Sequence, residues 1–235
     1  NRMDVTTYTK RFSRKQSFTD KDMSAFLEKL GRWTLRRPLE KREVILYRGI
    51  TTSVVANGGS YEEAVGLVLQ AMLQSPRFIY RMENQYTGGR VGNFELAVRL
   101  SYLIWGAPPD EALYAAADQG KLSSPEQIRI QINRMLKDPR AVDRSVQFLS
   151  QWLNLGHLAN LRPDKNHFPR WNPSLADDMR AETIAFFKEI VWKQNRPLSD
   201  LFNAQFSYLT SQLAQHYRLT PLQTGKGTLR YDLTK

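Results

Sequence analysis

The chain has no cysteine, and this absence excludes more chemistry than any other feature of its composition. Without thiols the chain forms no disulfide, no thiolate zinc site and no cysteine nucleophile, and it has no Cys-x-x-Cys-His segment for covalent haem attachment. The compartment is not fixed by this, because a cysteine-free chain suits both cytosol and periplasm. Histidines number only three, few for a metalloenzyme. We therefore expect no cofactor and no metal site in this chain.

Long apolar runs are also missing from the 235 residues. No stretch approaches the roughly 18–20 apolar residues that cross a bilayer, so we expect no membrane span. Neither a signal peptide nor an initiator methionine stands at Asn1, which predicts a mature form or a fragment. There is no phosphate-binding Gly-rich loop, no nucleophile elbow and no His-Glu-x-x-His motif. The known motifs therefore indicate no reaction.

Charge is abundant but unevenly placed, with 34 basic and 23 acidic residues and a net charge of +11. Residues 1–48 carry 13 basic and 6 acidic side chains, and residues 218–235 carry 4 and 1. The residues between are nearly neutral. Basic ends attract nucleic acid, an anionic surface or an acidic partner, or they are simply solvated tails. We take Arg11, Arg14 and Lys15 as candidate partner contacts, and the neutral middle argues against nucleic acid.

Helix start signals and helical apolar spacing recur along the chain. Ser60 to Glu63 forms a capping box, while Ser124-Pro125, Asp138-Pro139 and Asn172-Pro173 each combine a cap with proline at the first helical position. The pattern predicts an all-α fold, a roughly nine-helix orthogonal bundle with long connecting loops. We expect a basic arm at 1–17, an N-terminal helical domain at 18–87, a main helical domain at 88–219 and a flexible tail at 220–235.

The chain is organised around residues 94–122. An apolar helix there ends at the Gly-Ala-Pro-Pro-Asp segment 106–110, and an alanine-rich helix follows and ends at Gly120. We expect the preceding helices to lead into this element and the following helices to pack on it.

Two groups of residues are candidates for acid–base chemistry. Glu182 lies in an otherwise apolar helix, where a carboxylate is costly unless paired, and we take Arg99 as its partner. Asp164 and His167 lie in the irregular segment 154–172, and long loops in compact domains are often functional. Each group also has a structural interpretation: an ion pair that fixes helix registry, and a loop hydrogen bond. His216 is interpreted as a cation at a helix C-terminus.

The tryptophans fall mostly on apolar helical faces, which predicts that they belong to the core (Trp33, Trp105, Trp152, Trp171 and Trp192). Trp171 is the one that we also consider as an exposed stacking surface for a sugar or a protein partner, because Arg170 and a proline precede it.

Several segments, in this order, resemble a known family. They are Arg36-Arg37-Pro38-Leu39 with Glu43; residues 75–81 with Glu83; residues 100–105 with Pro109-Asp110; residues 120–122 and 134–136; Asp138-Pro139-Arg140; residues 151–153; Asp164; Phe168-Pro169; Glu182-Thr183; Phe186-Phe187; Leu213-Ala214 and His216-Tyr217. The chain resembles the planctomycete-type, cytochrome c-associated domains of unknown function over about residues 30–220. Two tandem helical domains of a longer exported protein are implied, with their join near Gly88-Gly89.

The resemblance implies a periplasmic or extracellular location, and it places haem c on a partner domain or chain. It carries no catalytic residues, because the family has none agreed. We therefore expect a non-catalytic helical scaffold or docking module, a fragment that packs against the remaining domains or a cleaved chain of its parent and against a c-type cytochrome. The alternatives are an enzyme with an acid–base site at the 154–172 loop, acting on a polysaccharide or similar substrate, and a basic nucleic-acid-binding protein.

Overall fold

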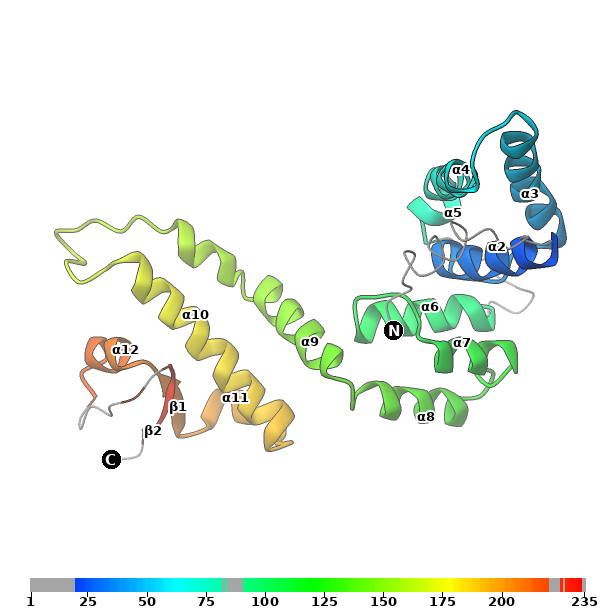
Figure 1. The fold of residues 1–235 in the computed structure, drawn as a ribbon. Helices are drawn as coiled ribbons and strands as arrows, with labels where there is room; N and C mark the ends of the chain where they lie inside the picture. Colours follow the sequence, from blue (N-terminus) through cyan, green and yellow to red (C-terminus); the bar gives the residue numbers. More distant parts are fainter. Residues whose placement is uncertain (1–19, 82, 84–90, 220–224, 226, 234–235) are drawn as a thin grey trace. The chain divides into compact units, whose positions relative to one another are not determined.

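The computed structural model describes residues 20–81, 83, 91–219, 225 and 227–233 (Figure 1). The chain divides into two compact units: unit 1 holds residues 1–103 and 107–132, and unit 2 holds residues 104–106 and 133–235. The described residues are mostly helical, with one small two-stranded sheet in unit 2. The predicted helical fold class is therefore confirmed, and the sheet is the feature that the sequence pattern did not reveal.

Unit 1 contains the following helices: α2 (Asp20–Leu35), α3 (Lys41–Ala56), α4 (Tyr61–Leu73), α5 (Pro76–Ile79), α6 (Asn93–Ile104), α7 (Glu111–Asp118) and the first part of α8 (Pro125–Met135). The apolar stripe of α2 packs against α3 and α4. The buried members of this core are Met23, Phe26, Leu27, Leu30, Leu35, Tyr47, Val65, Val68 and Met72.

Two polar contacts attach α7 to α2 within unit 1. The Tyr114 hydroxyl donates to the backbone carbonyl of Arg32 over 3.0 Å, and the Arg32 guanidinium pairs with Asp118 at 2.7 Å. Burial raises the pKa of Tyr114, which keeps its hydroxyl a donor. These contacts join an earlier helix, α2, to the segment 94–122.

Local cap chemistry sets the helix starts, as the sequence predicted. The Ser60 side chain accepts from the Glu63 amide and Glu63 reaches back to the Ser60 amide, forming the capping box of α4. Asp110 caps α7, and the break before it begins at Gly106, whose φ of +67° is readily adopted only by glycine.

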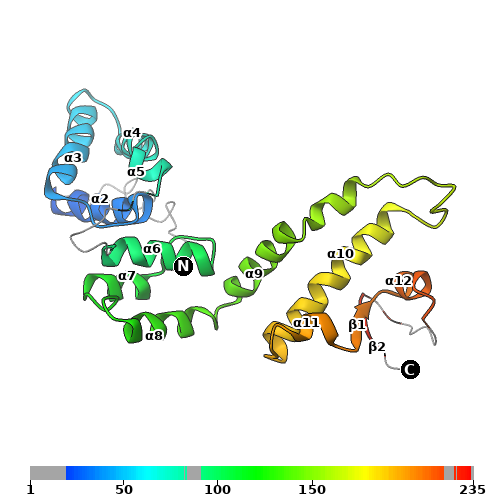
Figure 2. The ribbon, with the colours of Figure 1, turned by 180° about the vertical axis from the view of Figure 1, so that it is seen from behind.

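Unit 2 contains α9 (Pro139–Trp152), the 3₁₀ turn η1 (Leu155–Asn160), α10 (Pro173–Phe187), the π-helical η2 (Lys188–Lys193), α11 (Asp200–Asn203), β1 (Phe206–Leu209), α12 (Ser211–His216) and β2 (Leu229–Asp232). Helices α9 and α10 lie side by side in both views (Figures 1 and 2). Trp192 in η2 donates its indole N–H to the Ser145 hydroxyl of α9 over 2.8 Å, which fixes the two helices in register.

The predicted flexible tail at 220–235 is wrong for residues 229–232. Strand β2 pairs antiparallel with β1, with Tyr231 opposite Ser207. Tyr231 is buried with Leu175, Leu209, Leu213 and Ala214. The sequence did not reveal this because a four-residue strand gains its stability from the partner strand and the core beneath it, not from local propensity.

The predicted boundaries are only partly within the described residues. The basic arm at 1–17 and the join at Gly88-Gly89 lie outside them. The two compact units divide later, at 104–106 and 132/133, so that α6, α7 and most of α8 belong to unit 1. Helices of the described residues are all too short or too polar to cross a membrane.

We expect Tyr231→Ala to lower the free energy of unfolding of unit 2 by about 2–4 kcal/mol, because it removes a buried aromatic ring from the core. Urea unfolding of the full chain, with hydrogen exchange of β1 and α12 amides as the local readout, measures the loss. Leu233→Ala is the matched control, since that side chain is substantially exposed, and it should change stability by less than about 0.5 kcal/mol. Unprotected β1 amides in the unmodified chain would contradict the strand pairing.

Candidate functional site

The best-defined polar contact in unit 1 is made by Arg36. This residue follows α2 with a φ of +61°, and its guanidinium is almost fully buried. Its Nη2 donates to the backbone carbonyls of Arg77 at 2.5 Å, Phe78 at 3.0 Å and Tyr80 at 3.2 Å. These carbonyls at the end of α5 lack helical partners, so one cation satisfies three acceptors. The two family-like segments at 36–39 and 75–81 therefore meet in space.

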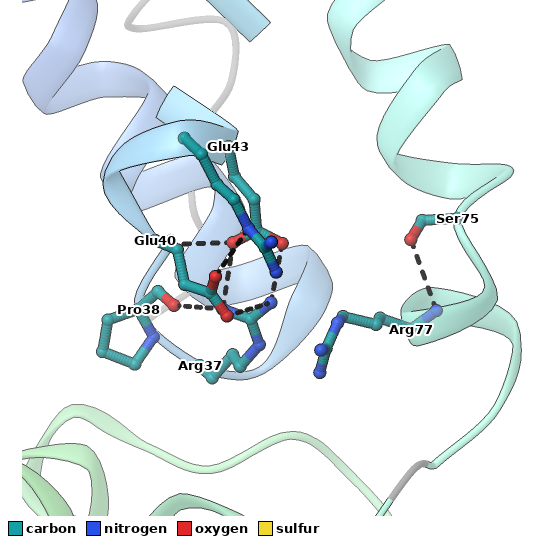
Figure 3. Close-up of polar contacts among 7 residues, drawn as sticks. Arg37, Pro38, Glu40, Glu43, Ser75 and Arg77 are labelled. Carbon is teal, nitrogen blue, oxygen red and sulfur yellow. Dashed lines mark hydrogen bonds and ion pairs between the residues drawn. The ribbon is translucent and has the colours of Figure 1, made fainter. Parts of the chain in front are cut away.

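Arg37, the next residue, supports the start of α3. Its guanidinium forms a two-bond fork with Glu43, at 3.0 and 2.7 Å (Figure 3). Glu43 also accepts the backbone N–H of Glu40 over 2.8 Å. The bidentate geometry fixes the turn between α2 and α3.

Glu43 stays ionised in this setting. Partial burial favours a higher pKa, but the hydrogen bonds from Arg37 and from the Glu40 amide outweigh it, and the pKa of Glu43 lies below its ordinary value. The positive charge of Arg77, which Figure 3 shows beside the pair, acts in the same direction. An ionised carboxylate fixed between arginines is a structural anchor, because it has little tendency to accept a proton near neutral pH.

Trp105 is the centre of a second cluster, in unit 2. Its indole N–H donates to the backbone carbonyl of Met135 over 3.0 Å. The guanidinium of Arg140 lies 3.7 Å from the ring centroid, and that of Arg134 lies 5.6 Å from it. Cations over a tryptophan face are favourable. Three of the family-like segments, at 100–105, 134–136 and 138–140, thus converge on one buried ring.

Asp138 connects this cluster to α9. Its carboxylate caps the helix through the Arg140 amide at 2.9 Å and pairs with the Arg140 guanidinium at 2.9 and 2.7 Å. The side-chain bonds from Arg140 outweigh desolvation and lower the pKa of Asp138 to about 2. The same arginine therefore holds the helix start and covers the tryptophan.

Arg99 and Glu182, which we predicted as partners, belong to different units, and each has contacts within its own unit. Arg99 forms a bidentate pair with Glu83 within unit 1. Glu182 in α10 accepts hydrogen bonds from Ser207 at 2.6 Å and Tyr217 at 3.0 Å. Its neighbours are neutral hydroxyls, which satisfy a half-buried carboxylate without a cation.

Tyr217 reinforces this assignment. Burial, with the Glu182 carboxylate beside it, raises the pKa of Tyr217 to about 12. The phenol remains a donor at all physiological pH values. The arrangement ties α10 to β1 and to the end of α12 through hydrogen bonds from two hydroxyl groups.

The tryptophans differ from the prediction in a way that matters for function. Trp105 is buried as expected, but Trp33 and Trp152 are exposed. Trp152 stacks on Phe148, one turn earlier on α9, with ring centroids 6.1 Å apart and an interplanar angle of 19°. The two side chains are 65% and 62% exposed. We call Phe148 and Trp152 the aromatic pair. Helical spacing had indicated a core stripe, but the buried face of α9 is formed by Ala141 and Leu149.

A pocket of about 680 Å³ lies in unit 2, where the 154–172 segment meets α10 and the end of α12. We call it the loop pocket. Its apolar wall is formed by Leu161, Pro163, Phe168, Pro169, Trp171 and Met179. Trp171 and Met179 also pack against the buried core of unit 2, which gives the wall a rigid base. The size is within the range of small-molecule sites.

The remaining residues of the loop pocket are cationic or able to become so: His167, Arg170, His216 and Arg218. The sequence singled out His167 and Arg170 in the loop, but it gave no role here to His216 or Arg218, which are about 50 positions further on. The contacts that bring them together are tertiary. The one local signal at Arg218 is its place after α12, where it adopts a φ of +60°.

Asp164 organises the loop itself. Its carboxylate accepts from the Asn166 amide at 2.8 Å and contacts the His167 ring nitrogen Nδ1 at 3.0 Å, and its carbonyl accepts from the Phe168 amide at 2.8 Å. Bonds from the Asn166 amide and the His167 ring hold the pKa of Asp164 below its ordinary value. Both side chains are largely exposed, 52% for Asp164 and 78% for His167. The pair therefore acts as a turn that presents His167 at the pocket.

Among the described residues, no three His, Asp or Glu side chains gather closely enough to hold a metal ion. The absence of cysteine excludes a covalent haem c site in this chain. The candidate contacts Arg11, Arg14 and Lys15 lie outside the described part of the sequence.

The two helical units, with the clusters around Arg36 and Trp105, define a tandem-domain helical chain. Comparison with known families shows which family this chain belongs to. The model of the family PSD4, described as a protein of unknown function (DUF1592), matches residues 91–219, and that of PSD5, described as a protein of unknown function (DUF1595), matches residues 22–83. The first match covers more than half of the 235 residues, so the chain belongs to the PSD4 family, with a PSD5 domain ahead of it. No curated protein and no solved structure matches it.

These descriptions support the coarser part of the resemblance, two tandem domains of unknown function. They name no activity, no cytochrome and no compartment. The matches end at residue 83 and begin again at residue 91, on either side of the predicted join.

We expect Arg36→Ala to lower the free energy of unfolding of unit 1 by about 2–3 kcal/mol, because three partly buried carbonyls lose the guanidinium that donates to them. Arg36→Gly should cost about 1 kcal/mol less, since glycine adopts the positive φ without strain. Hydrogen exchange of α2 and α5 amides in the full chain measures both losses.

The control for this prediction is Arg42→Ala, whose side chain is largely exposed and which should change stability by no more than about 0.5 kcal/mol. An alanine variant as stable as the unmodified chain would show that the Arg36 guanidinium contributes nothing.

We expect Asp138→Asn to destabilise unit 2 in a pH-dependent way. Asparagine keeps the cap but loses the ion pair with Arg140. Because the pKa of Asp138 is lowered to about 2 on folding, the carboxylate stabilises the chain above its ordinary pKa near 4, and this contribution disappears as pH falls from about 4 to 2. The partly exposed pair limits the difference to about 0.5–1 kcal/mol. Urea unfolding of both forms from pH 7 to pH 2 tests this, and a difference independent of pH would refute it.

Proposed function

We propose that the chain is a non-catalytic helical docking module of an exported, haem c-linked assembly, and that the aromatic pair on α9 is its main partner contact. The observation that supports this proposal is the stacking of Phe148 on Trp152, with more than 60% of each residue exposed. Two large rings held against each other on the outside of a helix present a preformed apolar surface. Such surfaces, when they are contiguous, mark interaction sites.

The geometry of the aromatic pair suits a binding hot spot. The rings are one helical turn apart on a regular α-helix, so their backbone positions are already ordered before any partner arrives. Leu153, also exposed, extends the apolar surface toward the end of α9. Tryptophan and other aromatic residues contribute most binding energy in protein interfaces, because a large rigid area is buried at small cost in conformational entropy.

The charge of the chain supports an acidic partner. A net charge of +11 attracts an acidic surface and speeds association with it. The similarity to cytochrome c-associated domains suggests the partner: further domains or a cleaved chain of the parent protein, with a c-type cytochrome that carries the haem. The same similarity suggests a periplasmic or extracellular location. The chain itself has no covalent haem c site, since it has no cysteine.

The enzyme alternative has one observation in its favour, the placement of Asp164 and His167 at the loop pocket. A general base that works near neutral pH needs a pKa near neutrality. The pKa of Asp164 is lowered instead, and the pair is exposed to water. Acid–base catalysis on a polysaccharide is therefore the less supported proposal, and the loop pocket is better suited to binding than to proton transfer.

We expect the double variant Phe148→Ala/Trp152→Ala to lose its partner. The tagged full chain is isolated from its native source under mild conditions, and co-eluting chains are identified by intact mass and by a haem Soret band. The unmodified chain should carry a haem-bearing partner, and the double variant should retain at least about tenfold less of it, because the loss of aromatic hot-spot residues costs an interface more than about 1.4 kcal/mol.

The matched control is Phe202→Ala on α11, which removes an even more exposed aromatic ring, 87%, elsewhere in unit 2. It should retain the partner. Equal retention by the double variant would overturn the role of the aromatic pair. A retained partner without a Soret band would support docking and overturn the haem link.

A further inference from the structure

The loop pocket brings together two arginines and two histidines, and no acidic side chain is among its lining residues, although Asp164 contacts His167 beside it. Within the part of the chain that the structure describes, neither Arg170 nor Arg218 forms an ion pair. Arginines usually form ion pairs where carboxylates are close by, as Arg37, Arg99 and Arg140 do in this same molecule. Two guanidinium groups at one pocket without a carboxylate are therefore well suited to an anion from outside the chain.

His216 adds an independent sign of a ligand site. Its ring nitrogen Nδ1 is buried and has no hydrogen-bond partner among the described residues. An unsatisfied buried polar atom costs about 1–3 kcal/mol, and in native proteins such atoms call for an explanation. His216 lines the loop pocket together with Arg218, at the end of α12. A bound molecule that reorders the side chains here offers the missing partner.

The opposite wall of the pocket is apolar and firm. Trp171 is supported from behind by the core of unit 2, and its amide donates to the Phe168 carbonyl over 3.0 Å, so the two aromatic residues are held by one turn. A flat aromatic wall favours a ring or another apolar face of a ligand. Inorganic anions have no such face.

We propose that the loop pocket binds a small organic anion, whose negative group is held by Arg170 and Arg218 and whose ring or apolar body lies against Trp171 and Phe168. A pocket of about 680 Å³ accommodates a molecule of one to a few rings. This site is separate from the aromatic pair on α9 and does not depend on the docking function. Two classes of ligand offer a negative group on such a body, an aromatic carboxylate and an acidic saccharide. They differ in the body and share the anionic group.

Binding to the full chain is measured by calorimetry and by backbone amide shifts in NMR. The probes are 1-naphthoate and a galacturonate trimer, each with a neutral counterpart, 1-naphthalenemethanol and a galactose trimer, and inorganic sulfate. We expect one of the two organic anions to bind at least tenfold more tightly than its neutral counterpart and than sulfate, with shifts confined to residues 161–171 and 216–218. Which anion binds identifies the body of the ligand.

Variants separate the charge from the apolar wall. Arg170→Gln/Arg218→Gln should weaken the preferred anion at least tenfold and bring it to the level of its neutral counterpart. Phe168→Ala, at an exposed position where folding is not at risk, should weaken the anion and its neutral counterpart alike. The matched control is Arg180→Gln on α10, an exposed arginine outside the pocket lining, which should bind as the unmodified chain does.

Three outcomes would overturn the proposal. They are the absence of binding by every probe, equal affinity for an anion and its neutral counterpart, and equal loss in the Arg180→Gln control. Sulfate that binds as tightly as the organic anions would likewise show that the apolar wall plays no part.

Discussion

Unit 2 depends on the contact between the indole of Trp105 and the guanidinium of Arg140, 3.7 Å from the ring centroid. The same arginine pairs with Asp138, and Asp138 caps α9, so one side chain links the turn after α6 to the start of the next long helix. A cation shared between an aromatic face and a carboxylate has little freedom to move, because each partner restricts the other. The course of α9, which carries the aromatic pair, therefore follows from this contact.

Local chemistry was readable from the sequence wherever the interacting residues are close along the chain. The caps at Ser60, Asp138 and Asn172 act within three residues, and each was predicted. The contacts of Arg36 were not, because its acceptors are backbone carbonyls about 41 to 44 residues away, and a carbonyl leaves no trace in the sequence. The family-like segments were recognised from their residues alone. Only the structure shows that several of them contact one another in space.

The candidate site follows the same division. The loop, its Asp164 and its His167 were predicted as a place of interest, since irregular length and polar residues are visible in sequence. Their meeting with His216 and Arg218 depends on how α12 packs against α10, which is a tertiary property. The prediction that Trp152 belongs to the core was wrong for a related reason. Helical spacing shows which residues share a face, but it does not show whether that face meets a partner within the chain.

The two family matches and the two compact units divide the chain at different places. The PSD5 match ends at residue 83, yet unit 1 continues through α6, α7 and most of α8, which belong to the PSD4 match. The contacts of Arg32 with Tyr114 and Asp118 join helices from the two matches within one unit. Helix α2, which belongs to the PSD5 match, therefore makes some of its polar contacts with α7 of the PSD4 match. This physical dependence is a reason for the two domains to occur in tandem, since each match taken alone leaves part of unit 1 without its partners.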